Sequence, residues 1–131
     1  MIETGLEAGG RFSFTYDFSK HGGAISAITV GPAIIPPQTI IVQATIRVVT
    51  ACLGTNGTMA LMLVGAGDII TATNVSALTL DALIVGVPVP QTASTWILTT
   101  AHTSLTFTIA TTAFTAGKVD VNLFGYRSQT V

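Results

Sequence analysis

The feature that most constrains the fold of this chain is an alternation of apolar and polar residues with a period of two. It runs through residues 12–18, 39–50 and 104–110, where every second residue is aromatic or aliphatic. Successive side chains of a β-strand point to opposite faces, whereas a helical pattern repeats every 3.6 residues. The pattern therefore predicts strands that each bury one face.

The alternation also predicts which side chains face the core. We expect the following residues to point inward: Phe12, Phe14, Tyr16, Phe18, Ile40, Val42, Ala44, Ile46, Val48, Leu105, Phe107, Ile109, Val119, Val121 and Leu123. In the last strand, at residues 118–127, Phe124 and Tyr126 would then lie on the outward, polar side.

Glycine, proline and asparagine divide the chain into about eight short strands. Gly31-Pro32 is expected to end a strand at residues 24–30, and Asn56-Gly57 is typical of a hairpin turn. No segment has a convincing helical period, although residues 76–80 allow a single turn. Many short strands separated by such turns indicate an all-β fold. We predict an antiparallel β-sandwich or jelly roll, with a small barrel as the alternative.

The length of 131 residues fits one domain. Residues 11–131 are predicted to form a single β-sandwich domain. Residues 1–10 contain three glycines and no periodicity, so they are expected to form an N-terminal arm. Such an arm either contacts a neighbouring molecule or simply frays.

The chain is unusually poor in charge. Charged residues make up 8% of it and apolar residues 49%, with a net charge of −1. Intrinsic disorder is excluded by the apolar content, and five Lys and Arg cannot build the basic face that nucleic acid requires. A small domain with so little charge should associate unless other polar groups solvate it. The 22 threonines supply part of that solvation, and burial against partners would supply the rest.

Neither a membrane nor an oxidising compartment is expected. The longest apolar runs are interrupted by proline, glycine and threonine, so they predict several strands instead of a spanning helix. The first residues lack the pattern of a secretory signal, and the single Cys52 cannot form an intrachain disulfide. Synthesis in the reducing cytoplasm of a host is the expectation.

No motif for catalysis, cofactor binding or metal binding is found. The carboxylates are scattered singly, and His21 and His102 each lie in a predicted turn, far apart in the chain. A metal site needs three or four converging ligands, and glycoside hydrolysis needs paired carboxylates. The turn at residues 65–68 lacks the third glycine of a dinucleotide-binding loop. We therefore expect no enzyme activity, no cofactor and no metal.

The remaining candidates are surface contacts. Residues 58–64 are apolar on both faces, which is typical either of a central strand covered twice or of a strand in a subunit interface. Bulky residues on the outward side of the last strand are further candidates, because interface hot spots favour aromatic residues and arginine. The interface residues predicted on these grounds are Met59, Leu61, Met62, Phe124, Tyr126 and Arg127.

Several stretches of the sequence resemble small virion structural proteins of tailed bacteriophages. These stretches are residues 11–18 (RFSFTYDF) with the following His21-Gly22-Gly23, residues 28–32 (ITVGP), the turn at 65–68 (GAGD) and residues 115–121 (TAGKVDV). The resemblance extends roughly from Arg11 to Arg127, and its motifs are structural.

The resemblance implies a capsid decoration (cement) protein, often a β-sandwich or jelly-roll trimer bound on the shell. Its partners would be the major capsid protein and further copies of itself, and its location would be the surface of the virion. Two alternatives stay open. One is a receptor- or glycan-binding β-module of a tail or head fibre, for which Trp96 and Asn122 are the only hints. The other, a cupin-like metalloprotein, lacks the required His/Glu cluster.

Overall fold

The computed structural model describes residues 9–127, which form nine strands and three single-turn helices. The strands are β1 (Gly9–Asp17), β2 (Ser26–Ile35), β3 (Thr39–Leu53), β4 (Thr58–Met62), β5 (Ile70–Asn74), β6 (Leu83–Val85), β7 (Ile97–Leu98), β8 (Thr103–Ala110) and β9 (Ala116–Arg127). The helical turns are α2 (Phe18–His21), η1 (Val75–Ala77) and η2 (Ala93–Thr95). Residues 1–8 of the predicted arm lie outside the described residues, and Gly9 and Gly10 belong to β1.

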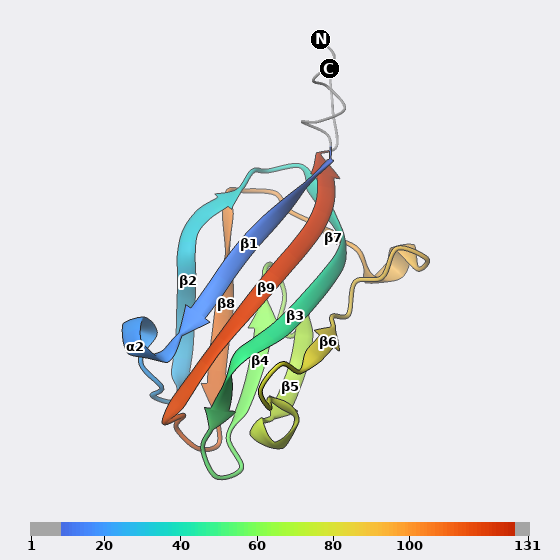
Figure 1. Cartoon of the computed structure of the whole chain (residues 1–131). Helices are drawn as coiled ribbons and strands as arrows, with labels where there is room; N and C mark the ends of the chain where they lie inside the picture. Colours follow the sequence, from blue (N-terminus) through green and yellow to red (C-terminus); the bar gives the residue numbers. More distant parts are fainter. Residues whose placement is uncertain (1–8, 128–131) are drawn as a thin grey trace.

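The strands form two antiparallel sheets that face each other (Figure 1). Sheet A has the order β1-β9-β3-β6, and β7 also pairs with β3; sheet B has the order β2-β8-β4-β5. The pairing is nested along the chain, because β1 pairs with β9, β2 with β8, β3 with β6 and β7, and β4 with β5. This nested pairing is that of a jelly roll. The prediction of an all-β sandwich or jelly roll is confirmed.

Period-two alternation correctly identified the buried face of three strands. Phe14 and Tyr16 of β1 are buried, as are the predicted inward residues of β8 and β9. The core therefore lies between the two sheets, where each strand contributes every second side chain.

Aromatic rings join the two sheets at the centre of this core. Tyr16 of sheet A stacks on Phe107 of sheet B, with ring centroids 4.0 Å apart and planes inclined by 5°. Phe114 meets both rings edge-on, at 6.5 Å and 6.2 Å. The Tyr16 hydroxyl donates a hydrogen bond to the Gly22 carbonyl at 2.6 Å. The Tyr16 hydroxyl is thus satisfied by the turn after α2.

The prediction for the first part of β3 was wrong. Ile40 and Val42 were expected to point inward, but Ile41 is the buried residue there and Ile40 lies on the outer face. The pairing of β3 with β9 shifts by one residue between Ile41 and Gln43. Such a β-bulge reverses the phase of all residues on one side of it. Ile40, Ile41 and Val42 are all apolar, so the alternation is interrupted at the bulge, but the sequence does not say which of the three faces the core.

β2 is longer than predicted. Gly31 and Pro32 do not end it, because β2 continues to Ile35 after a shift of its pairing with β8 between Val30 and Ile35. Gly31 has a φ of +80°, a conformation that side chains other than glycine rarely adopt. β2 is one of the two edge strands of sheet B, where proline is tolerated because no neighbour needs its missing N–H.

Two local predictions also need correction. The Asn56-Gly57 turn does not close a hairpin, because β3 before it belongs to sheet A and β4 after it to sheet B. A helical turn, α2, was not expected at residues 18–21. The Asp17 side chain caps it by accepting a hydrogen bond from the Ser19 N–H at 3.0 Å.

Replacement of Gly125 by alanine is expected to destabilise the protein. A Cβ atom at Gly125 would overlap the Ile40 carbonyl group of the neighbouring strand. Overpacking of this kind costs about 1–3 kcal/mol of unfolding free energy. Gly10→Ala is the matched control, because a Cβ atom there meets nothing within 4 Å. Urea denaturation measures both variants, and equal midpoints for the two would contradict the packing described for β3 and β9.

Ionisation of Tyr16 is expected to destabilise the fold at high pH. Burial, together with the nearby Cys52 and Asp17, raises the pKa of Tyr16 to about 12, against about 10 in an unfolded chain. The contribution of protonated Tyr16 to the free energy of unfolding is therefore complete below pH 10 and is lost as the pH rises towards 12. Tyr16→Phe should flatten the pH dependence of thermal unfolding in this range. The same pH dependence in the parent chain and in Tyr16→Phe would refute the assignment.

Candidate interaction surfaces

The two outer faces of the sandwich differ in charge. Six of the nine charged residues within 9–127 lie on strands of sheet A, whereas β2, β4, β5 and β8 carry no Asp, Glu, Lys, Arg or His. The six on sheet A are Arg11, Asp17, Arg47, Lys118, Asp120 and Arg127. The few charged residues in this part of the chain therefore lie mostly on sheet A.

Polar side chains on the outer face of sheet A are linked across strands. The Ser13 hydroxyl donates to Asn122 Oδ1 at 2.7 Å, and the Thr15 hydroxyl donates to Asp120 Oδ1 at 2.9 Å. Both bonds follow the antiparallel register of β1 and β9, in which these residues are direct partners. The serine and threonine hydroxyls thus have acceptors within the sheet, and neither is hydrogen-bonded to a histidine.

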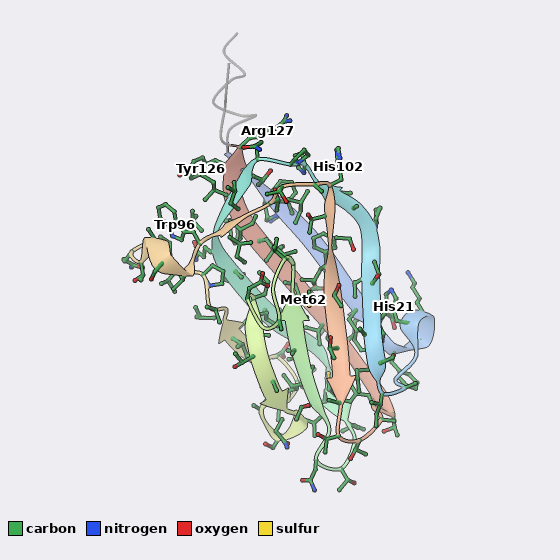
Figure 2. All side chains as sticks on the ribbon, turned by 180° about the vertical axis from the view of Figure 1, so that it is seen from behind. His21, Met62, Trp96, His102, Tyr126 and Arg127 are labelled. Carbon is green, nitrogen blue, oxygen red and sulfur yellow. The ribbon has the colours of Figure 1, made fainter. Side chains whose placement is uncertain are left out.

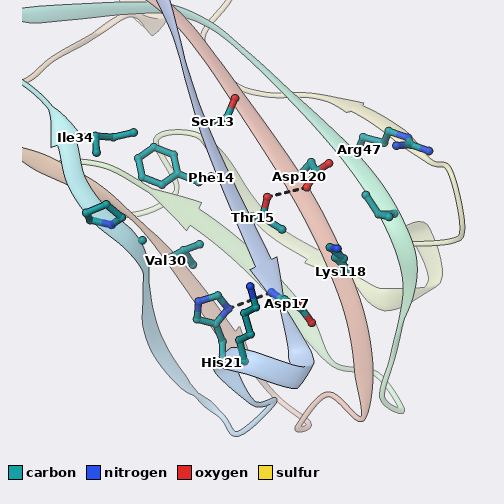
Figure 3. A pocket seen from close by; sticks show the side chains of 14 residues that line it. Ser13, Phe14, Thr15, Asp17, His21, Val30, Ile34, Arg47, Lys118 and Asp120 are labelled. Carbon is teal, nitrogen blue, oxygen red and sulfur yellow. Dashed lines mark hydrogen bonds between the residues drawn. The ribbon is translucent and has the colours of Figure 1, made fainter.

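A groove of about 510 Å³ opens beside β1 on this side of the molecule (Figure 3). Phe14 and Ile34 line its apolar part, and Asp17, His21 and Lys118 line its polar part. The Asp17 N–H donates to His21 Nδ1 at 3.1 Å. Hydrogen bonds from the Ser19 hydroxyl and N–H lower the pKa of Asp17, with a smaller contribution from the charges of Lys118 and Lys20. These groups order the turn after β1, and they do not form a nucleophile–base pair.

The outer face of sheet B is neutral, because its strands carry no charged residue. Its register aligns Ala27 with Thr108 and Ala60 in one row across β2, β8 and β4. The next row contains Thr29, Thr106 and Met62. Small residues and threonines thus make up the middle of this face, and Met62 is its one large apolar residue in these two rows.

The structure separates the interface residues that the sequence predicted. Met59 and Leu61 are completely buried between the sheets, so they belong to the core and are not available to a partner. Met62 lies on the outer face of sheet B, whereas Tyr126 and Arg127 lie at the end of β9 in sheet A (Figure 2). Phe124 is half-buried on the outer face of sheet A, and Tyr126 is 39% exposed. These residues do not form one surface.

A different apolar surface lies along the β6–β7 edge of sheet A. Leu83 and Val85 are 79% and 67% exposed, and Val87 and Leu98 are 40% and 49% exposed. β6 and β7 pair with successive parts of β3, so these side chains lie along one edge of the sheet. We call Leu83, Val85, Val87 and Leu98 the edge stripe.

Sequence reasoning missed the edge stripe. The available signal was that Leu83, Ile84 and Val85 are all apolar, although an edge strand with one solvated face should alternate. Ile84 packs against the core, and its two neighbours point to the outer face. Residues 58–64 are likewise apolar on both strand faces. Only the pairing of the strands shows in which of the two segments an apolar face is left exposed to solvent.

A neutral loop projects from the same edge. Residues 86–96 leave the sandwich between β6 and β7 (Figure 1) and include η2. The Trp96 Nε1–H donates to the Val89 carbonyl at 2.9 Å, and the Thr95 hydroxyl donates to the Thr92 carbonyl at 2.7 Å. The loop is therefore held in shape by its own hydrogen bonds. The indole N–H of Trp96 and the Oδ1 of Asn122 are both engaged in hydrogen bonds within the chain.

The residues described contain no group of three or more His, Cys, Asp or Glu that could hold a metal ion. Across the same part of the chain, no helix is long and apolar enough to cross a membrane. His102 is exposed, whereas His21 is half-buried and stacks beside Tyr16 at 5.8 Å. Burial raises the pKa of the Cys52 thiol to about 11, so it is protonated at neutral pH.

Comparison with solved structures identifies chains of the same fold in phage capsids. A chain of the cyanophage Pam1 capsid asymmetric unit is 18% identical, with a TM-score of 0.63 over 92% of this chain and 87% of that one. A chain of the acid-stable capsid of Helicobacter pylori bacteriophage KHP30 is 7% identical, with a TM-score of 0.65 over 95% and 91%. A chain of the Ralstonia phage GP4 capsid is 17% identical, with a TM-score of 0.59 over 94% and 88%.

No protein-family model matches the sequence, and no curated protein matches it significantly. The similarity to the three capsid chains extends over nearly the whole of each chain, so they share one sandwich of similar size. At these identities, the comparison establishes the fold.

Cys52 should resist thiol reagents in the native protein. Its side chain is buried and its pKa is raised, so little thiolate forms at pH 8. We expect slow modification by a disulfide reagent in buffer and complete modification in urea. Rapid labelling of the native protein would show that the thiol is accessible and reactive.

Proposed function

We propose that this chain is a non-enzymatic structural protein of a phage virion, and specifically a capsid decoration (cement) protein. The observation that carries the proposal is the similarity of its fold, over at least 92% of its length, to chains of three phage capsids. The resemblance of its sequence to small virion proteins of tailed phages points in the same direction.

The partners in this proposal are the assembled shell of the major capsid protein and further copies of the chain, three in the expected assembly. A protein that binds only the assembled shell stabilises that state by mass action. At a free concentration one hundred times the dissociation constant, each site gains about 2.7 kcal/mol. The location implied is the capsid surface.

The surfaces of the chain support a role in binding. A cement protein needs a rigid scaffold and surfaces that pack against other proteins, and it needs no reactive group. The described residues provide a neutral sheet face, an exposed apolar edge and a projecting loop with internal hydrogen bonds. The groups most often used in catalysis, Cys52 and His21, are buried or held by the backbone.

Deletion of this chain from the phage that encodes it tests the proposal. We expect heads to assemble without it and to release their DNA at a lower temperature or after milder osmotic shock. Addition of the purified chain should restore resistance, and cryo-electron microscopy should then show its density on the outside of the shell.

Three results would contradict the proposal. Failure of the shell to assemble would indicate that the chain builds the shell itself. Unchanged stability of the deleted heads would exclude a cement role. Density on a tail or fibre, together with binding of the isolated chain to glycans, would favour the receptor-binding alternative.

A further inference from the structure

We propose that the edge stripe is the surface through which one copy of this chain contacts a second copy. The inference rests on the proposed function, which includes association of the chain with copies of itself. It places that contact on the edge stripe and not on the six interface residues predicted from the sequence. Tyr126, which is 39% exposed, pairs with Ile40, the residue of β3 that also pairs with Leu98 of the stripe.

The register of β6 exposes both its side chains and its backbone. Val48 N–H donates to the Ala82 carbonyl, and Gly86 N–H donates to the Ala44 carbonyl, at 2.9 Å and 2.8 Å. Backbone groups alternate in direction along a strand, so those of Leu83 and Val85 point away from β3 to the free edge. An apolar edge of this kind is a template for pairing with another chain.

The stripe supplies a substantial part of the apolar area that a stable contact needs. Its four exposed fractions correspond to about 200 Å² of apolar surface, at roughly 60–120 Å² for a fully exposed aliphatic residue. A standard interface buries about 800 Å² per partner, of which about 57% is apolar. The stripe would provide a little under half of this apolar part, and the loop at residues 86–96 and the strand backbone would add further area.

The charge distribution also fits contact with a neutral surface. Residues 82–100 contain no charged side chain. Arg47, the direct partner of Leu83 in the sheet, forms an ion pair with Asp81 at 2.9 Å. Two copies can therefore meet along β6 without burying an unpaired charge, which is costly in an interface.

A second copy is the partner that is present at every stage. A cement protein must remain in solution until shells have assembled, although its net charge is only −1. An exposed apolar surface at near-zero net charge promotes association. Contact between copies covers the stripe before any shell is available, and it leaves the neutral face of sheet B and the groove beside β1 free for the shell.

Substitution of two stripe residues by lysine tests the inference. The full-length Leu83→Lys/Val85→Lys variant should have the mass of a single chain by light scattering at micromolar concentration, whereas the parent chain should have a multiple of it. Both positions are highly exposed, so the circular dichroism spectrum and the melting midpoint of the single chain should persist. Ala27→Lys/Thr29→Lys is the matched control, with the same charges at alternate positions of another edge strand, and it should retain the parent mass.

A second measurement does not depend on the variants. Trp96 is the only tryptophan, and it lies in the loop beside the stripe. When the parent chain is diluted, the fluorescence of Trp96 should shift around the same protein concentration at which the mass measured by light scattering falls. A parent chain of single-chain mass, or a stripe variant that keeps the parent mass, would overturn the inference. If the parent chain is monomeric and its stripe variant no longer binds shells, the stripe contacts the shell and not a second copy. That result would overturn the inference and leave the proposed cement function intact.

Discussion

The stacking of Tyr16 on Phe107 is the contact around which the sandwich is organised. It joins an edge strand of sheet A to an inner strand of sheet B at a centroid distance of 4.0 Å, and Phe114 closes it from the side. Because these rings must lie between the sheets, alternate residues of β1 and β8 are committed to the core. The polar residues between them are thereby committed to the two outer faces.

The outer faces then differ because the charged residues are unevenly distributed among the strands. β1, β3 and β9 carry most of the charge and lie side by side in sheet A, whereas all four strands of sheet B are uncharged. Hydrogen bonds such as Ser13 to Asn122 organise the charged face within the chain. The neutral face, the edge stripe and the loop remain as surfaces for other proteins, which suits a molecule whose proposed role is binding to a shell and to its own copies.

Much of the fold could be predicted, because burial of one strand face leaves a local record in the sequence. Phe14, Tyr16, Phe107 and Val121 were all correctly assigned to the core. The bulge in β3 was missed, because Ile40, Ile41 and Val42 are all apolar and only the pairing with β9 shows which of them faces the core. The interface residues were less predictable still. Met59 and Leu61 were assigned to an interface because residues 58–64 are apolar on both faces, and the sequence does not say which strands lie beside them.

The sequence by itself determined that this is a charge-poor β-sandwich without a recognisable catalytic motif, because period-two alternation and composition are local properties of the chain. Tertiary structure decided which apolar residues stay exposed. Leu61 and Leu83 are the same residue type in similar apolar strands, yet one is fully buried and the other is 79% exposed. The difference arises because β4 lies between β8 and β5, and Leu61 points into the core, whereas β6 lies at an edge, and Leu83 points to an outer face that no other strand covers.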